Sequence, residues 1–308
     1  GTGSHLGQAS SLGGYAMTVK KQAGKAEPDW LQKKRQLATL LQSHFPVLPG
    51  QEQWLPWQTT SCTGQENGGW LRHAGTYTAL PLEEAVWDYS ELLQENLMEK
   101  ALRWQDNQLF AGHLANIDGG QFIYVPDDCQ LTVPLEFTGQ GCLANPHNVI
   151  IVGARSQVTI DERLMVKSAQ GLFAGTEILL GAGARVEYRQ ANDLRAPVVY
   201  TAVHAYQAHG ATLDLHLVVA NQGAVTVSAS NFLDGAGSEW TTTALLDPGD
   251  TGQLRFIPVA DGFGQGSHAD LTTYINDQGQ GQVKLTPFKT GSGEPLPLKS
   301  TVIRKSGA

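Results

Sequence analysis

Residues 208–224 read AHGATLDLHLVVANQGA, a strand-sized apolar segment between two corners. Every odd position from Leu213 to Val219 is apolar, whereas Asp214 and His216 occupy even positions between them. Successive side chains of a β-strand point to opposite sides, so this alternation predicts a strand with one buried face. Asp214 and His216 should then face outward, between two corners that are rich in Gly and Ala.

The same unit recurs along the chain from about residue 117 to residue 256. The corner glycines Gly210, Gly223, Gly237 and Gly252 follow one another at almost equal steps. A constant step that holds only strand-sized segments is typical of a β-solenoid, in which each coil stacks on its neighbours. The fold class that we expect is therefore mostly β, a right-handed β-helix (β-solenoid) core with an N-terminal helical region.

Helical signals precede this region. Pro28 and Asp29 are favourable at the start of a helix that Pro46 would end, and Pro81 introduces a second helical pattern that we expect over residues 82–104. We therefore divide the sequence into four parts. Residues 1–16 are a vector-like leader, and residues 17–108 are the N-terminal helical region. Residues 109–285 form the β-helix core, and residues 286–308 form a C-terminal tail rich in Gly and Pro.

Composition excludes several classes of protein. The chain has 308 residues, of which 41% are hydrophobic and 16% charged, with a formal net charge of −8. Its largest basic cluster is Lys33-Lys34-Arg35, so we expect no nucleic-acid binding, and no apolar run is long enough for a membrane span. The segment after Met17 is too polar for a secretory signal, and the three cysteines show no disulfide framework. These features favour a cytoplasmic location.

Four phrases of the sequence resemble, in order, the core of the SufB/SufD family of scaffold proteins. The first is LFAGHLANIDGGQFIYVP at residues 109–126, which is similar to the family's entry into its β-helix. The others are LTVPL at 131–135, HNVIIVGA at 147–154 and GTEILLGAGARVEY at 175–188. The resemblance extends over about residues 29–246, including the N-terminal helices.

The resemblance implies a non-enzymatic scaffold subunit, SufD-like, in iron–sulfur cluster assembly. Its implied partners are a SufB-like scaffold or a second copy of the chain (a homodimer), and a Suf-type ABC ATPase. It also implies that a cluster forms only transiently with a partner, so we expect no cofactor bound stably by this chain alone. Two departures stand out: Thr272 occupies the position where SufD-type members carry a functional histidine, and no helical segment follows the β-helix.

Several residues are candidate ligands. Iron–sulfur clusters are held mainly by thiolates, and Cys129 and Cys142 are separated by one step of the repeat, whereas Cys62 has no obvious partner. His268 is a further candidate for a site at an interface. The densest set of potential metal ligands is His204, His209, Asp214 and His216. For each candidate the simpler interpretation stays open, namely a buried small cysteine or a solvated surface side chain.

Two other functions remain as alternatives. A carbohydrate-binding or carbohydrate-active β-helix would use an outward patch, for which Glu187, Arg189, Asp193 and Arg195 are candidates. A self-assembling structural solenoid would polymerise through its ends. The sequence contains no GxxxxGK[ST], HExxH or GxSxG motif, so ATP hydrolysis, if the function needs it, is the task of a partner.

Overall fold

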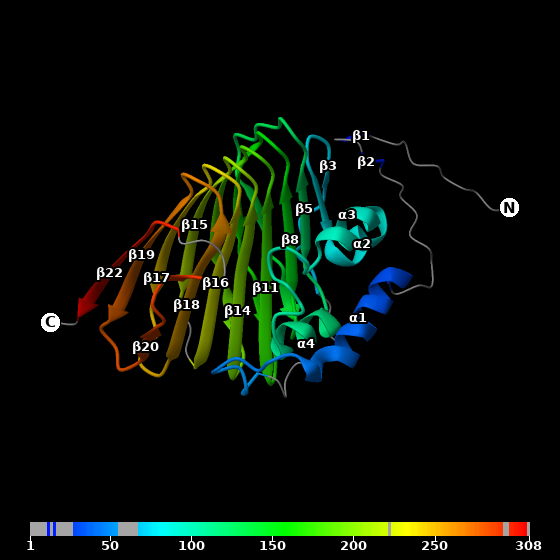
Figure 1. Ribbon diagram of the computed structural model, residues 1–308. Helices are drawn as coiled ribbons and strands as arrows, with labels where there is room; N and C mark the ends of the chain where they lie inside the picture. Colours follow the sequence, from blue (N-terminus) through cyan, green and yellow to red (C-terminus); the bar gives the residue numbers. More distant parts are fainter. Residues whose placement is uncertain are drawn as a thin grey trace.

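The computed structural model describes residues 27–54, 67–220, 223–291 and 296–306, together with two short paired strands, β1 (Ser11–Leu12) and β2 (Tyr15–Ala16). Most of the leader, residues 1–16, and Cys62 lie outside the described residues. Over the described part, parallel strands follow one another along a single axis from the N-terminal helices to the C-terminus (Figure 1). The predicted β-solenoid is therefore confirmed.

Three sheets form the walls of the solenoid over these residues. The large sheet contains, in spatial order, β20 (Gln282–Leu285), β18 (Gln253–Phe263), β16 (Ala224–Asp234), β14 (Val198–Gln207), β11 (Gly171–Leu180), β8 (His147–Val152), β5 (Gln121–Val125), β4 (Thr78–Pro81) and β3 (His73–Ala74), and β21 (Lys289–Thr290) also pairs with β18. The second sheet contains β22 (Leu298–Ser306), β19 (His268–Asp277), β17 (Glu239–Leu246), β15 (Thr212–Val219), β12 (Arg185–Ala191), β9 (Gln157–Glu162) and β6 (Leu135–Phe137). A short sheet contains β13 (Asp193–Arg195), β10 (Met165–Lys167) and β7 (Gln140–Cys142).

One corner of every coil is built in the same way. Residues in the left-handed backbone region recur at Asp128, Arg155, Gly183, Gly210, Gly237 and Gly266, with φ between 56° and 74°. They follow one another at nearly equal intervals, and one coil corresponds to two of the steps seen in the sequence. The N–H of each but the last donates to the carbonyl of the residue just before the next, as in Gly183 N to His209 O (3.0 Å) and Gly210 N to Ala236 O (2.9 Å). We call this set the corner column.

The inward side chains make the main core. Leu213, Leu215, Leu217 and Val219 are all buried in it, as the alternation predicted, and Asp214 and His216 lie on the outer face. Burial of these apolar side chains between the sheets is the main source of stability, at roughly 1.5–3 kcal/mol for each large side chain.

The N-terminal region covers part of the large sheet and creates a second core. It comprises α1 (Asp29–Leu41), the 3-10 helix η1 (Gln42–His44), α2 (Leu82–Asp88), α3 (Ser90–Asn96) and α4 (Gln108–Asn116). In α4 the N-cap Asn107 side chain accepts a hydrogen bond from Phe110 N at 2.9 Å. Phe110 then packs edge-on against Phe173 and Tyr200, which point outward from the large sheet. Figure 1 shows these helices beside the first strands of the solenoid.

The structure differs from the sequence predictions in three places. The helix expected over residues 82–104 is two helices that end at Asn96 and are interrupted at Tyr89, whose hydroxyl is 2.7 Å from the Thr78 hydroxyl. By the alternation rule, Thr226 and Ser228, beside the core residues Val225 and Val227, should face outward and be exposed, but they are buried. The region expected as a tail, residues 286–308, contributes β21 and β22, which continue the two main sheets. In each case a contact distant in sequence overrides the local pattern.

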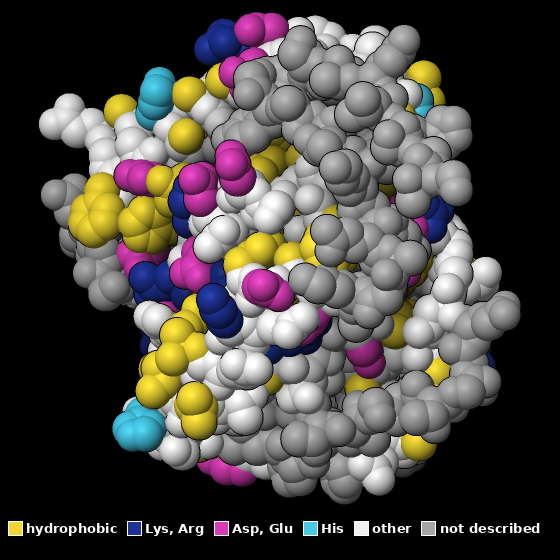
Figure 2. Space-filling view, turned by 90° about the vertical axis from the view of Figure 1, so that its right-hand side faces the viewer, with side chains coloured by type: hydrophobic (Ala, Val, Ile, Leu, Met, Phe, Trp, Pro, Cys, Tyr) yellow, Lys and Arg dark blue, Asp and Glu magenta, His cyan; other side chains and the backbone are white. Residues whose placement is uncertain are grey.

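Among the described residues, none of the helices combines the length and the apolar composition that a membrane span requires. Figure 2 shows the end of the molecule that carries the N-terminal helices. On the described surface visible there, acidic, basic and hydrophobic side chains are interspersed.

Candidate functional site

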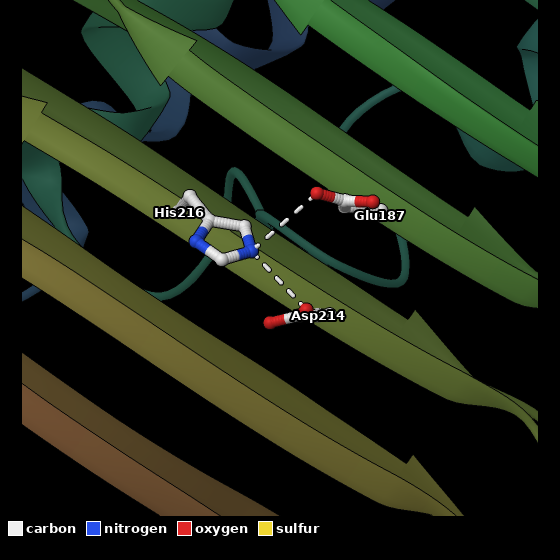
Figure 3. A group of neighbouring side chains, drawn as sticks. All are labelled: Glu187, Asp214 and His216. Carbon is white, nitrogen blue, oxygen red and sulfur yellow. Dashed lines mark ion pairs between the residues drawn. The ribbon is translucent and has the colours of Figure 1, made fainter. Parts of the chain in front are cut away.

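Glu187, Asp214 and His216 converge on the outer face of the second sheet (Figure 3). Glu187 on β12 lies directly opposite Asp214 on β15 in the parallel register, and His216 lies further along the same face of β15. The His216 Nε2 atom is 3.1 Å from Asp214 Oδ2 and 3.7 Å from Glu187 Oε1. The sequence therefore predicted two members of this group, but it assigned Glu187 to a different patch.

Arg189 and Asp161 flank the group. The two side chains form a two-point ion pair, in which Arg189 Nε bonds Asp161 Oδ1 and Arg189 Nη2 donates to Asp161 Oδ2 at 2.8 Å. The hydrogen bonds to Asp161 raise the pKa of Arg189 above its usual value. The Arg189 guanidinium reaches Glu187 only at 3.9 Å, so its charge is directed mainly at Asp161.

The other predicted histidine ligands lie elsewhere. His204 is on β14, buried under the N-terminal region, and its Nε2 atom is 2.8 Å from Ser228 Oγ. Burial lowers the pKa of His204 to about 4, so its imidazole is neutral and packs within the second core. His209 lies in the corner between β14 and β15, and His268 opens β19; neither belongs to the cluster of ligand atoms found among the described residues.

The structure does not bring the cysteines together as a ligand pair. Cys129 is a free, partly buried thiol whose Sγ atom is 3.7 Å from Thr76 O, and burial raises the pKa of this thiol. Cys142, on β7 of the short sheet, is disulfide-bonded. The expectation that the cysteines form no disulfide is therefore wrong for Cys142. Pairing between distant cysteines depends on the fold and leaves no signature in their spacing.

The residues that the sequence suggested for a carbohydrate patch fall into two places. Glu187 and Arg189 lie on the second sheet, whereas Asp193 and Arg195 lie on β13 of the short sheet. Arg195 and Asp193 pair with each other, with Arg195 Nη2 to Asp193 Oδ2 at 2.9 Å. The four side chains thus do not line one common groove.

A buried polar chain that the sequence did not reveal connects α4 to the large sheet. His113 Nε2 is 2.9 Å from His147 Nδ1, and His147 Nε2 is 2.8 Å from Glu177 Oε2. At its ends, His113 Nδ1 is 3.1 Å from Asn145 Oδ1, and Glu177 accepts hydrogen bonds from the Met98 and Leu102 amides. We call His113, His147 and Glu177 the buried relay.

Burial sets the protonation of the buried relay. It raises the pKa of Glu177 to about 8 and lowers the pKa of His147 to about 3. It also holds the pKa of His113 well below its usual value. At neutral pH the relay is therefore uncharged, and one direction of donation satisfies it: the Glu177 hydroxyl donates to His147, His147 to His113, and His113 to Asn145.

A second buried carboxylate lies inside the solenoid. Glu162 Oε1 accepts hydrogen bonds from Thr176 Oγ1 (2.6 Å), Tyr188 Oη (2.7 Å) and Asn148 Nδ2 (3.0 Å). Its Oε2 atom accepts from Gln190 Nε2 and Asn192 Nδ2, each at 2.6 Å. These partners come from the coil of Glu162 itself and from the coils on both sides, so Glu162 connects neighbouring coils. Burial removes the Glu162 oxygens from water, and these hydrogen bonds replace the lost hydration.

The C-terminal part of the second sheet carries a row of exposed apolar side chains. Val218, Leu245, Tyr274 and Ile303 are consecutive partners in the register of β15, β17, β19 and β22, and each is 41–44% exposed. We call them the apolar row. Within the described residues β22 pairs with β19 alone, so its other edge presents unpaired backbone groups.

One family model matches part of this solenoid. Residues 136–258, which run from β6 to β18, match the model of the SufBD core domain of the SUF system for iron–sulfur cluster assembly. The described solenoid thus contains a segment similar to the SufBD core domain, and this match supports a protein of the SufB/SufD family.

Among individual proteins, the chain is similar to the iron–sulfur cluster assembly protein SufD of Bacillus subtilis (strain 168). The two are 27% identical over 122 residues, which represent 37% of this chain and 28% of SufD. The chain thus matches less than a third of the length of that relative.

The described residues fit poorly as the whole ligand set of an iron–sulfur cluster. Such clusters are usually held by four thiolates. The described part of the chain has one free cysteine, Cys129, whose raised pKa disfavours the thiolate form.

Proposed function

We propose that this chain is a non-enzymatic scaffold subunit in iron–sulfur cluster assembly, and that it acts by pairing with a SufB-like protein or with a second copy of itself. The match of residues 136–258 to the SufBD core domain carries this proposal. The nascent cluster would be cargo, with its ligands shared between two chains. A single free thiol among the described residues is consistent with such sharing.

The surface that supports pairing best is formed by β22 and the apolar row, which we call the C-terminal rung. β22 offers nine residues of open strand edge, and the apolar row leads to it across the sheet. An open edge favours addition of another strand, and clustered exposed apolar side chains favour burial against a partner. Two copies joined edge to edge at β22 would extend the second sheet across a two-fold axis.

The pairing is tested by molar mass in solution. We expect the full chain to be a dimer, and Ile303→Asp to shift it to monomer because a charge would be buried at the new interface. Val133→Asp is the matched control, since Val133 is also apolar and 73% exposed but lies outside the apolar row. A monomer at all concentrations, or a dimer insensitive to Ile303→Asp, would contradict pairing through β22.

The role in cluster assembly needs a separate test with partners. We expect the full chain to co-purify with a co-expressed SufB-like protein and a Suf-type ATPase. We expect anaerobic loading of the chain alone with iron and sulfide to give little cluster absorbance, and loading of the joint complex to give more. If the chain co-purifies with neither protein and the complex gains no cluster, the proposed role is wrong.

A further inference from the structure

We propose that Glu187, Asp214 and His216 form a binding site for a divalent transition-metal ion of the Zn²⁺ type. The site is independent of the C-terminal rung and of the proposed scaffold role. It lies on the outer face of β12 and β15, where three side chains direct one nitrogen and two carboxylate groups toward a common point (Figure 3).

The spacing of the donor atoms suits such an ion. Zn²⁺ binds imidazole nitrogen and carboxylate oxygen at about 2.0–2.2 Å, so two ligands of a tetrahedral site are about 3.4 Å apart. The His216 Nε2 atom is 3.1 Å from Asp214 Oδ2 and 3.7 Å from Glu187 Oε1. These two separations lie on either side of the ideal value, and small side-chain rotations would equalise them.

The choice of metal follows from the donors. An imidazole with two carboxylates suits borderline first-row cations, whereas Mg²⁺ and Ca²⁺ prefer oxygen ligands alone. Three protein ligands leave a tetrahedral ion with one open position.

A second observation concerns the His216 nitrogen. Its Nε2 atom is shielded from solvent and makes no hydrogen bond of acceptable geometry, although it faces two carboxylates. A lone pair directed at two anionic groups is repulsive unless a proton or a metal ion lies between them. A proton can bridge to only one carboxylate at a time, whereas a metal ion engages both.

The surroundings favour a cation. Arg189, which reaches Glu187 at 3.9 Å, is committed to Asp161 through two contacts, and their charges cancel. With a neutral imidazole, the three ligands carry two negative charges, and among the described residues the contact of Arg189 with Glu187 at 3.9 Å is the one ion pair that Lys or Arg forms with them. The backbone beneath them is held on both sides, because β12 pairs with β9 and β15, and β15 pairs with β12 and β17. The ligands are thus preorganised, and little ordering is needed on binding.

Calorimetric titration of the chelator-treated full chain with Zn²⁺ tests the proposal. Binding elsewhere on the chain is subtracted by comparison with His216→Ala, Asp214→Asn and Glu187→Gln. We expect each of these variants to lose one equivalent of Zn²⁺ or to weaken it at least about tenfold, because even residues that merely support a metal ligand are worth about 10–100-fold. His268→Ala is the matched control, since His268 opens β19 on the same sheet. It should bind like the unaltered chain.

Circular dichroism and thermal unfolding show whether the variants fold. All three positions are partly exposed, so we expect wild-type unfolding temperatures in chelator. Co²⁺ provides an independent readout, through visible absorption that is lost in the same three variants. The proposal is overturned if the chain binds no Zn²⁺ beyond that bound by His216→Ala. It is also overturned if only His216→Ala reduces binding, which would indicate a lone surface histidine.

Discussion

At the scale of single residues, the buried relay shows how burial decides protonation. His147 and Glu177 are each fully buried, and neither can carry a charge without a large desolvation cost. The relay therefore contributes to stability as an uncharged hydrogen-bonded chain. Its stability contribution depends on pH in a way that can be worked out from the two shifted pKa values.

The two groups limit stability at opposite ends of the pH range. The pKa of Glu177 rises from 4.5 to about 8 on folding, so its contribution is complete below pH 4.5 and is lost as the pH rises through about 8. The pKa of His147 falls from 6.5 to about 3, so its contribution is complete above pH 6.5 and is lost as the pH falls toward about 3. Between pH 4.5 and 6.5 the two effects oppose each other.

Glu177→Gln isolates the alkaline limit. The glutamine oxygen still accepts from the Leu102 amide, and its amide nitrogen, in the place of Oε2, donates to His147 as the protonated acid does, but this nitrogen cannot accept from the Met98 amide. At about pH 4.5, where the contribution of Glu177 is complete, we expect this variant to be about 1–3 kcal/mol less stable than the unaltered chain, because the Met98 amide loses its acceptor. Between about pH 7 and pH 9 it should lose less stability than the unaltered chain, as measured by urea unfolding at each pH. Glu136→Gln, at an exposed residue of β6, is the control. Identical pH profiles for the unaltered chain and Glu177→Gln would show that Glu177 is not protonated in the folded state.

At this scale the sequence predicted only two of the three residues of the candidate metal site. Alternation alone placed Asp214 and His216 on one face of a strand. Glu187 could not be added to them, because the register that joins it to Asp214 lies across a whole coil of the chain. The buried relay was missed for a similar reason: His113, His147 and Glu177 occur in three separate apolar segments, where each one looks like an isolated exception.

At the scale of elements, the corner column explains why the coils have nearly constant length. At the end of each coil the chain must place a residue with left-handed backbone conformation directly above the corresponding residue of the preceding coil. The Cβ position of Gly210 has its nearest neighbour at 3.9 Å, the Gly183 nitrogen, so the requirement for glycine there is conformational and not steric. The two earliest positions use Asp128 and Arg155, which tolerate the strained conformation beside a bidentate ion pair between them.

The corner column predicts opposite effects for two substitutions. Gly210→Ala should destabilise the protein by about 1–2 kcal/mol, the cost of an L-residue in the left-handed region. Arg155→Gly should change stability by less than about 1 kcal/mol, since relief of strain offsets the loss of an exposed ion pair. Both are measured by chemical unfolding at neutral pH. If Arg155→Gly is the more damaging of the two, the ion pair and not the backbone governs the corner.

At the scale of the whole molecule, two hydrophobic cores lie on opposite sides of one sheet. Side chains pointing inward from the large sheet join the solenoid core, and those pointing outward join the N-terminal helices. Phe110 holds the outer core through ring contacts with Phe173, Tyr200 and His204, with centroid distances of 5.6–6.2 Å. The helical region is thus attached to the solenoid mainly through this layer.

Phe110→Ala should therefore loosen the helical region before the solenoid. We expect a loss of about 3–5 kcal/mol in the stability of the outer core, as for large aromatic truncations. Hydrogen exchange should accelerate in α1 to α4 and stay slow in β11, β14 and β16. Leu213→Ala, inside the solenoid, is the matched comparison and should accelerate exchange in the strands. Uniform acceleration in both variants would mean that the two cores unfold as one unit.

The fold class and the N-terminal helical region could be predicted from the sequence because periodicity and glycine spacing are local. The limits of that reasoning appear at residues 298–306, whose composition looks irregular although they form the long strand β22. Edge strands need only one partner and one packed face, so their sequences are under weaker constraint. The polar residues Thr226 and Ser228 likewise gave no sign of their burial, because it depends on contacts distant in sequence, such as that of Ser228 Oγ with His204 Nε2 at 2.8 Å.

The corner column has a consequence for how such proteins change length in evolution. Equivalent backbone positions recur once in every coil. Duplication or excision of residues 183–209 would therefore connect two equivalent corner positions and leave both ends of the molecule intact. An insertion within a strand would shift its register, and one of odd length would move its apolar side chains to the outer face. Gene duplications inside this region should therefore survive in whole-coil units, and loops that vary in size should be confined to the opposite corners.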